Sequence, residues 1–163
     1  MLANQEEKWE KLKILDFLDT NAVTVDLAAT SKKSVLEELV ALLARDSKVK
    51  DAPTTVDILL EREKLGSTGI GQGIAIPHAK TDQAREVVAA FGLSKRGVPF
   101  DSLDGEPVYI FFLLVAPPDA SGLHLKALAR ISRLLKDKFF RQALRDVKDA
   151  ADVLKIIRDE DRY

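Results

Sequence analysis

The sequence predicts one layered α/β domain, in which helices cover both faces of a mixed sheet. Segments with strand patterns alternate with segments of helical periodicity, which is typical of this fold class. Residues 108–115 form an uninterrupted apolar run without alternation, as expected for a central strand buried on both faces. The 163 residues, of which 46% are hydrophobic, are enough to bury one sizeable core.

The chain is expected to open with a flexible arm, because residues 1–11 are charged and lack a clear apolar stripe. A single domain should follow at residues 12–163 and begin with a short helix at residues 12–18. Alternating apolar and polar residues at 23–27 then predict a strand. An amphipathic helix comes next, with either Thr30 or Ser31 as its N-cap.

A second helix and a glycine-rich segment follow. Thr54, three residues before Asp57, resembles a capping box and predicts the start of the helix, which Gly66 would end. Residues 66–73 read GSTGIGQG, with four glycines in eight positions. Residues 74–76 then predict a short apolar strand, which a proline stops.

The second half of the chain predicts strands first and helices last. Residues 87–93 predict a strand, residues 95–97 a turn, and residues 104–105 a further turn before the central strand. Three helices are expected to complete the chain, at residues 122–135, 139–144 and 150–158.

Composition and charge exclude several functional classes. The 25 Lys and Arg balance 26 Asp and Glu, for a formal net charge of -1, so we expect no nucleic-acid binding. There is no cysteine, which excludes disulfides, thiolate catalysis, iron–sulfur clusters and cysteine-type zinc sites. The N-terminus lacks the apolar core of a signal peptide, and no apolar run approaches the roughly 20 residues of a membrane span. We therefore expect a cytoplasmic protein without direct membrane insertion.

The glycine-rich segment fits neither common nucleotide-binding pattern. The pattern GxxxxGK[ST] fails because Gln72 follows Gly71 where a lysine is needed, and GxGxxG fails because Ile74 replaces the last glycine. Both patterns also place the glycines after a strand and before a helix, which is the reverse of the order here. Two interpretations stay open: a flexible connector, or a nest of backbone N–H groups for an anion near the next histidine.

The two histidines are the main candidates for chemistry. His78 follows the strand at residues 74–76, and sites in open α/β sheets lie at the carboxyl ends of strands. If Ser121 is the N-cap of its helix, His124 shares an inward-facing stripe with Leu128, Ile131 and Leu135. The helix N-terminus favours a neutral imidazole there. The alternative is that both histidines are half-buried structural residues.

Other site chemistries have less support. Neither HxH nor HExxH spacing is present, and Lys80 lies beside His78, so we expect no metal. No GxSxG elbow presents a nucleophile, although a Ser-His-Asp triad can be assembled on paper from Ser67, Ser102 or Ser121. Arg62, in the last turn of its helix, either interacts only with the helix dipole or clamps a phosphoryl group.

Residues 66–80, GSTGIGQGIAIPHAK, resemble the active-site motif of bacterial phosphotransferase-system IIA proteins of the fructose and mannitol class. Further segments agree in order, namely LLERE before the motif, DGEPV after it and LHLKALARIS at the second histidine. The resemblance covers nearly the whole chain from about Leu12, and TVDLAATSKKSVLEELVALLA is most similar to the nitrogen-regulatory branch. It implies a type-2 IIA domain at residues 12–163, with a mixed five-stranded sheet flanked by helices.

By this resemblance, His78 is the phosphorylated nucleophile, His124 supports it, and Arg62 matches the arginine of the family's Arg-Glu pair. Arg62, His124 and N–H groups of the glycine-rich loop would stabilise charge on the phosphoryl oxygens. The loop positions expected to bind the phosphoryl group are Gly66, Ser67, Thr68, Gly69, Gly71 and Gly73. An apolar rim for the donor is expected at Ile70, Ile74 and Leu123. No metal or cofactor is implied.

The resemblance also implies partners. The donor would be an HPr-type phosphohistidine protein, charged from phosphoenolpyruvate through enzyme I. The chain would then be a phosphotransferase component with a transient phosphohistidine, not an independent turnover enzyme. In the nitrogen-regulatory branch, target proteins of nitrogen and potassium control read the phosphorylation state. In sugar uptake the group passes to a cysteine of a IIB domain, here a separate one, and a third alternative is a binding module that never turns over.

Overall fold

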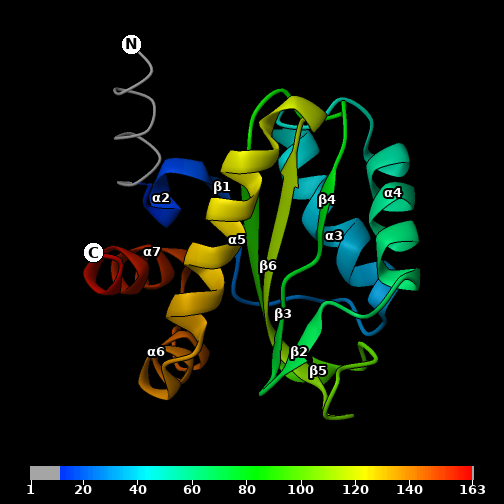
Figure 1. Ribbon diagram of the computed structural model, residues 1–163. Helices are drawn as coiled ribbons and strands as arrows, with labels where there is room; N and C mark the ends of the chain where they lie inside the picture. The colour runs from blue at the N-terminus through cyan, green and yellow to red at the C-terminus, as the bar shows by residue number, and fades with distance from the viewer. Residues whose placement is uncertain (1–11, 163) are drawn as a thin grey trace.

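A computed structural model describes residues 12–162 and confirms the predicted α/β class, with helices on both faces of a mixed sheet (Figure 1). The strands are β1 (Leu18–Thr24), β2 (Gly69–Gly71), β3 (Ile74–Ala75), β4 (His78–Lys80), β5 (Val88–Val98) and β6 (Val108–Ala116). The helices are α2 (Ile14–Phe17), α3 (Lys32–Arg45), α4 (Ala52–Lys64), the 3-10 turn η1 (Pro118–Ala120), α5 (Ser121–Leu135), α6 (Lys138–Arg145) and α7 (Ala150–Glu160). The arm expected at residues 1–11 lies outside the described residues.

Strand β6 is the centre of the sheet. It pairs antiparallel with β5 on one side and parallel with β3 and β4 on the other. The order is β1-β5-β6-β3-β2, with β4 also along β6. The expected sheet of five strands is therefore present as six, because β3 and β4 are successive segments of one line beside β6.

The side chains of β6 alternate between two hydrophobic cores, which explains why its sequence shows no polar alternation. One core lies under α2, α5, α6 and α7, and the other lies under α3 and α4 (Figure 1). The first core contains Ile110, Phe112 and Leu114. The second contains Phe111, Leu113 and Val115.

Pro77 separates β3 from β4 and sets the position of His78. A proline has no N–H for the sheet, but the Pro77 carbonyl oxygen accepts from the Leu114 N–H at 2.9 Å, so the chain stays beside β6. The register then places His78 opposite Leu114, near the carboxyl end of β6. The strand predicted at residues 74–76 is accordingly Ile74–Ala75, and His78 begins the next strand.

Two predicted strand boundaries are wrong. The first strand is Leu18–Thr24 and not residues 23–27, because β1 is a sheet edge where polar side chains are tolerated. Residues 95–97 are not a turn, since β5 continues to Val98. A local irregularity replaces the turn: Gly97 has a φ of 84°, and its N–H donates to Ser94 Oγ at 3.1 Å.

The helix caps were predicted with mixed success. Ser31 is confirmed as the N-cap of α3, since its Oγ accepts from the Ser34 N–H at 3.2 Å. For α4 the predicted start at Thr54 is wrong. Asp51 is the N-cap, and its Oδ1 accepts from the Thr54 N–H at 3.0 Å, while Pro53 lies in the first turn. Thr54 is thus inside the helix.

We predict that Asp51→Ala lowers the free energy of unfolding by about 1 kcal/mol, because the Thr54 N–H loses its acceptor. Thr54→Ala is the matched control and should change it by less than about 0.5 kcal/mol, since its exposed side chain does not cap the helix. Urea unfolding followed by circular dichroism measures both variants. Equal destabilisation by the two substitutions would contradict Asp51 as the cap.

Candidate active site

His78 is a half-buried side chain at the start of β4. Its Nδ1 lies 2.6 Å from the carbonyl oxygen of Ile76. A carbonyl oxygen can only accept a hydrogen bond, so Nδ1 carries the proton and donates it. In the neutral ring this leaves Nε2 unprotonated, with its lone pair available for chemistry.

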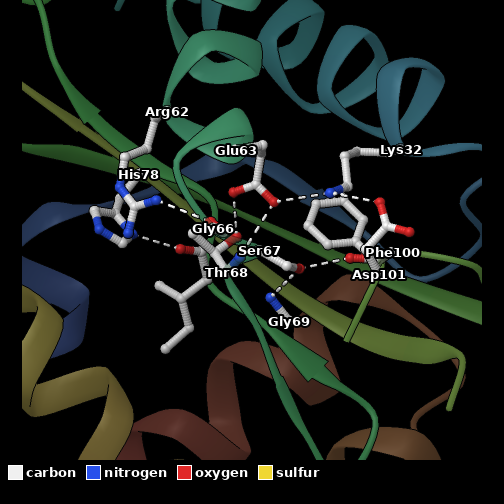
Figure 2. Close-up of polar contacts among 11 residues, drawn as sticks. Lys32, Arg62, Glu63, Gly66, Ser67, Thr68, Gly69, His78, Phe100 and Asp101 are labelled. Carbon is white, nitrogen blue, oxygen red and sulfur yellow. Dashed lines mark hydrogen bonds and ion pairs between the residues drawn. The ribbon is translucent and has the colours of Figure 1, made fainter. Parts of the chain in front are cut away.

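Arg62 approaches His78 from the last turn of α4 (Figure 2). Its Nη1 donates to the carbonyl oxygen of Gly66 at 2.9 Å, which holds the guanidinium against the turn that follows the helix. The positive charge of Arg62 is close enough to lower the pKa of His78. Arg62 therefore belongs to the surroundings of His78, beyond any interaction with the helix dipole.

His124 lies opposite His78, in the first turn of α5. The two ring centroids are 5.7 Å apart, with the ring planes inclined at 53°. His124 is buried, and its Nε2 has no hydrogen-bond partner within residues 12–162. A buried nitrogen without a partner is unfavourable, and such atoms often mark places that bind a ligand. The predicted inward stripe is confirmed by the buried Ile131 and Leu135 below it.

The surroundings keep both imidazoles neutral near pH 7. Burial lowers the pKa of His78, and the Arg62 charge lowers it further, while a backbone hydrogen bond and the Glu63 carboxylate partly offset this. Burial also lowers the pKa of His124 to about 4, with smaller contributions from His78 and Lys80. Two uncharged rings therefore face each other beside a guanidinium.

Lys80 is a further cation at the site, and the sequence patterns did not assign it a role. It ends β4, and its Nζ donates to Ser121 Oγ at 3.3 Å. Its position two residues after His78 in a strand was the available signal, because such residues share a face of the sheet. The sequence favours Ser121 as the N-cap of α5. In the structure the N-cap is Ala120, and Ser121 is the first residue of the helix.

At three positions of the glycine-rich segment, protein acceptors bind the backbone N–H groups that were one candidate for an anion-binding nest. The Gly66 N–H donates to the Glu63 carbonyl oxygen at 3.1 Å. The Thr68 N–H donates to Glu63 Oε1 at 3.2 Å, and the Gly69 N–H donates to Ser67 Oγ at 3.0 Å. Hydrogen bonds within the protein thus connect this segment to the end of α4, and these three N–H groups are not free donors.

Gly71 and Gly73 lie at a different level of the sheet from His78. The Gly73 carbonyl oxygen accepts from the Ile110 N–H at 3.0 Å, whereas His78 pairs opposite Leu114. Four residues of β6 separate these two positions, or about 13 Å at ~3.3 Å per residue. The φ angles of Gly71 and Gly73, 96° and 77°, shape the turn between β2 and β3 instead.

The apolar rim differs from the predicted one. Ile74 is buried, with 3% of its surface exposed, and Leu123 is partly buried against the core. Ile70 is 46% exposed but lies in β2, toward the distant turn. The exposed apolar side chains nearest in sequence to the site residues are Leu65 at 84%, just after α4, and Leu125 at 65%, in α5.

Two features are absent from residues 12–162. In that part of the chain, no group of three or more His, Cys, Asp or Glu side chains is arranged to hold a metal ion. None of the helices described there combines the length and apolar character that crossing a membrane requires.

Comparison with known proteins gives a consistent family. The family model of the EIIA 2 domain of the phosphoenolpyruvate-dependent sugar phosphotransferase system matches residues 16–160. A nitrogen regulatory protein of Bradyrhizobium diazoefficiens is 39% identical over 146 residues, which are 90% of this chain and 95% of that protein. The crystal structure of the nitrogen regulatory protein IIA-Ntr from Neisseria meningitidis superimposes with a TM-score of 0.81 and 36% identity, over 87% of this chain and 97% of that one.

A sugar-transport protein is also similar. The fructose-specific EIIABC component of the phosphotransferase system of Bacillus subtilis is 36% identical over 151 residues, which are 93% of this chain. The match covers 24% of that protein, so this chain spans about a quarter of its length. Similarity to nitrogen regulatory proteins therefore extends over nearly their full length, and similarity to this fructose protein does not.

The neutral, buried His124 predicts a loss of stability on acidification. An ordinary histidine has a pKa of 6.5, whereas His124 in the folded protein has a pKa of about 4. Between these pH values only the unfolded state binds the proton, so the free energy of unfolding falls as the pH drops from 6.5 to about 4. In the wild type, this decrease in the free energy of unfolding between pH 6.5 and about 4 includes a contribution from His124. We expect the decrease to be smaller by about 1–3 kcal/mol in His124→Gln.

Urea unfolding at pH values across this window measures the effect. The contribution of His78, whose pKa is also lowered, is present in both proteins and cancels in the comparison. The same pH dependence in the variant and the wild type would contradict a neutral, buried His124.

Proposed function

Because the chain belongs to the EIIA 2 family of the phosphoenolpyruvate-dependent sugar phosphotransferase system, we propose that it is a phosphoryl carrier whose His78 accepts the group. The proposed donor is the phosphohistidine of an HPr-type carrier protein. The chain then acts as a nitrogen- or potassium-type regulator, through the difference between its phosphorylated and free forms. It is a component of a phosphotransferase system and not an independent turnover enzyme.

The observation that carries this proposal is the hydrogen bond from His78 Nδ1 to the Ile76 carbonyl oxygen, 2.6 Å long. It supports Nε2 as the nucleophilic atom, because the proton is held on the other ring nitrogen. Burial and the Arg62 charge lower the pKa of His78, so its ring is neutral and nucleophilic near pH 7.

In the proposed step, the lone pair of His78 Nε2 attacks the phosphorus atom in line with the bond to the donor ring. The new N–P bond forms as the old one breaks, and the electron pair of the broken bond returns to the donor nitrogen. The proton of His78 stays on Nδ1, hydrogen-bonded to the Ile76 carbonyl oxygen, throughout. The step needs no group beyond the two imidazoles and the phosphoryl group that moves between them.

Side chains of two helices on opposite faces of the sheet, α4 and α5, supply charge stabilisation in this proposal. Arg62 offers a guanidinium that can meet two phosphoryl oxygens, and its position is fixed by the bond to Gly66. His124 Nε2, buried and without a partner among the described residues, can hydrogen-bond a third oxygen. Free backbone donors of the glycine-rich segment have no part in this version of the mechanism.

The 39% identity to a nitrogen regulatory protein, over 95% of that protein, favours the regulatory role. Phosphorylation adds about -1.5 to -2 charges at the site, which is enough to change how a partner protein recognises this surface. The alternative is a sugar-uptake IIA component, and the 36% identity to a fructose-specific EIIABC component favours it. That role requires a IIB cysteine on another polypeptide segment, because this sequence contains no cysteine.

Intact-mass spectrometry tests the proposed function directly. The protein is incubated with phosphoenolpyruvate, enzyme I and an HPr-type carrier, beside His78→Ala and His124→Ala. We expect one acid-labile phosphoryl group on the wild type and none on His78→Ala. Absence of any mass shift on the wild type would overturn the carrier role. Transfer onward to a cognate IIB cysteine would favour the sugar-uptake alternative.

We predict that Arg62→Ala slows phosphorylation of His78 by about 10²-fold, the usual effect of losing one preorganised charge-stabilising group. Arg45→Ala is the matched control, because Arg45 is the basic residue in the last turn of α3. Like Arg62 it can interact with a helix dipole, but it is not part of the proposed site. Rapid-quench measurement of the first-order labelling rate compares the variants. Equal rates for Arg62→Ala and Arg45→Ala would remove Arg62 from the site.

A further inference from the structure

A buried carboxylate lies directly behind the site and takes no part in the proposed transfer. Glu63 follows Arg62 at the end of α4 and is 6% exposed. Its Oε1 accepts from the Thr68 N–H at 3.2 Å, and its Oε2 accepts from Thr68 Oγ1 at 2.7 Å (Figure 2). A buried carboxylate is stable only when its charge is paired and its oxygens are hydrogen-bonded.

Lys32, the first residue of α3, supplies the opposite charge. Its Nζ lies 3.5 Å from Glu63 Oε1 and 3.1 Å from Asp101 Oδ2, and it stands over the ring of Phe100 at 4.8 Å from the ring centroid. The Lys32 side chain is 19% exposed and that of Glu63 is 3% exposed, so this contact is largely shielded from water. The contact with Asp101, whose side chain is 86% exposed, is open to solvent.

A continuous series of hydrogen bonds connects this ion pair to the nucleophile. Glu63 holds both the N–H and the hydroxyl of Thr68. The carbonyl oxygen of Thr68 accepts from the Ile76 N–H at 3.1 Å. The carbonyl oxygen of Ile76 in turn accepts from His78 Nδ1. Through these hydrogen bonds, the position of the Glu63 carboxylate influences the orientation of the His78 ring.

Glu63 also acts on His78 through its charge. The carboxylate raises the pKa of His78, in opposition to burial and to Arg62. An unpaired Glu63 would favour a protonated, non-nucleophilic ring and would repel the incoming phosphoryl group. Pairing with Lys32 reduces both effects, because opposite charges at this separation largely cancel at a distance.

From this arrangement we propose that Lys32 is a positioning residue for the phosphorylation of His78, acting through Glu63 without touching the phosphoryl group. Its role in the reaction rests on the carrier function proposed above. Its effect on the orientation and charge of the His78 ring rests on the contacts alone and is measurable without any donor.

The first measurement is the titration of His78 by NMR of the labelled imidazole ring. We expect the midpoint to rise by about 0.5 pH unit in Lys32→Met, where the Glu63 charge is uncompensated, and to fall by a similar amount in Glu63→Gln. Lys32→Arg should retain the wild-type value. Lys33→Met is the matched control, since Lys33 is the exposed next residue on α3 and should not move the midpoint.

The interpretation of these shifts requires the other charged groups at the site to be unchanged. Arg62 on α4, Lys80 on β4 and His124 on α5 act on the two rings and are present in every variant. Opposite shifts in Lys32→Met and Glu63→Gln are an electrostatic signature that a general loosening of the structure does not produce.

The second measurement is the rate of His78 phosphorylation in the same proteins. We expect Lys32→Met to be slower by roughly tenfold, less than a group that contacts the phosphoryl oxygens, and Lys32→Arg to recover most of the rate. The double variant Lys32→Met/Glu63→Gln should resemble Glu63→Gln alone, because the lysine acts only through the carboxylate.

An unchanged His78 midpoint in Lys32→Met, or a shift of the same sign in Lys32→Met and Glu63→Gln, overturns the proposal. If Lys32→Met does not fold, Lys32→Gln takes its place, and an unchanged midpoint in that variant overturns the proposal equally. A wild-type protein that is never phosphorylated but shows the opposite shifts removes the carrier function and leaves the positioning of the His78 ring supported. Phosphorylation of the wild type with no shift in any variant does the reverse.

Discussion

The parallel pairing of β4 with β6 is the constraint on which the site depends. It places His78 opposite Leu114, close to the point where β6 ends. From that end the chain passes through η1 into α5, which brings His124 to within 5.7 Å of His78 between ring centroids. Pro77 lies between β3 and β4, but its carbonyl oxygen still accepts a hydrogen bond from β6. The backbone that carries His78 is therefore held beside β6. The arrangement of the two histidines therefore depends on the pairing of the sheet.

The local backbone also influences the protonation state of His78, the proposed nucleophile. The Ile76 carbonyl oxygen holds the Nδ1 proton, and burial disfavours a second proton on the ring. The same burial would disfavour a phosphoryl dianion if the site held no cation. Arg62 resolves this conflict, because its charge favours an anion at His78 and at the same time lowers the pKa of the ring. One cation thus serves both the free nucleophile and its proposed product.

Patterns with local causes were predicted well from the sequence, and contacts between distant segments were not. The central strand, the inward stripe below His124 and the Ser31 cap follow from neighbouring residues and were confirmed. The Asp51 cap of α4 is missed because Thr54, with Asp57 three residues later, resembles a capping box and offers a competing start. Free backbone donors are one of two interpretations of the glycine-rich segment, and its sequence does not show that Glu63 Oε1 and Ser67 Oγ accept from two of its N–H groups. Lys32 lies 46 positions before His78 in the sequence, and only the fold brings it to Glu63.

The hydrogen bonds that these backbone N–H groups make affect how tightly the site can bind a phosphoryl group. Binding that stabilises a bound phosphoryl group as strongly as the transition state slows its release and does not accelerate the transfer. A cradle of several free N–H groups, as in nucleotide-binding loops, would hold the product tightly. In this protein the N–H groups of Gly66, Thr68 and Gly69 donate to acceptors within the protein. These three N–H groups are therefore not available to the phosphoryl group proposed on His78, and fewer donors suit a group that is received and passed on.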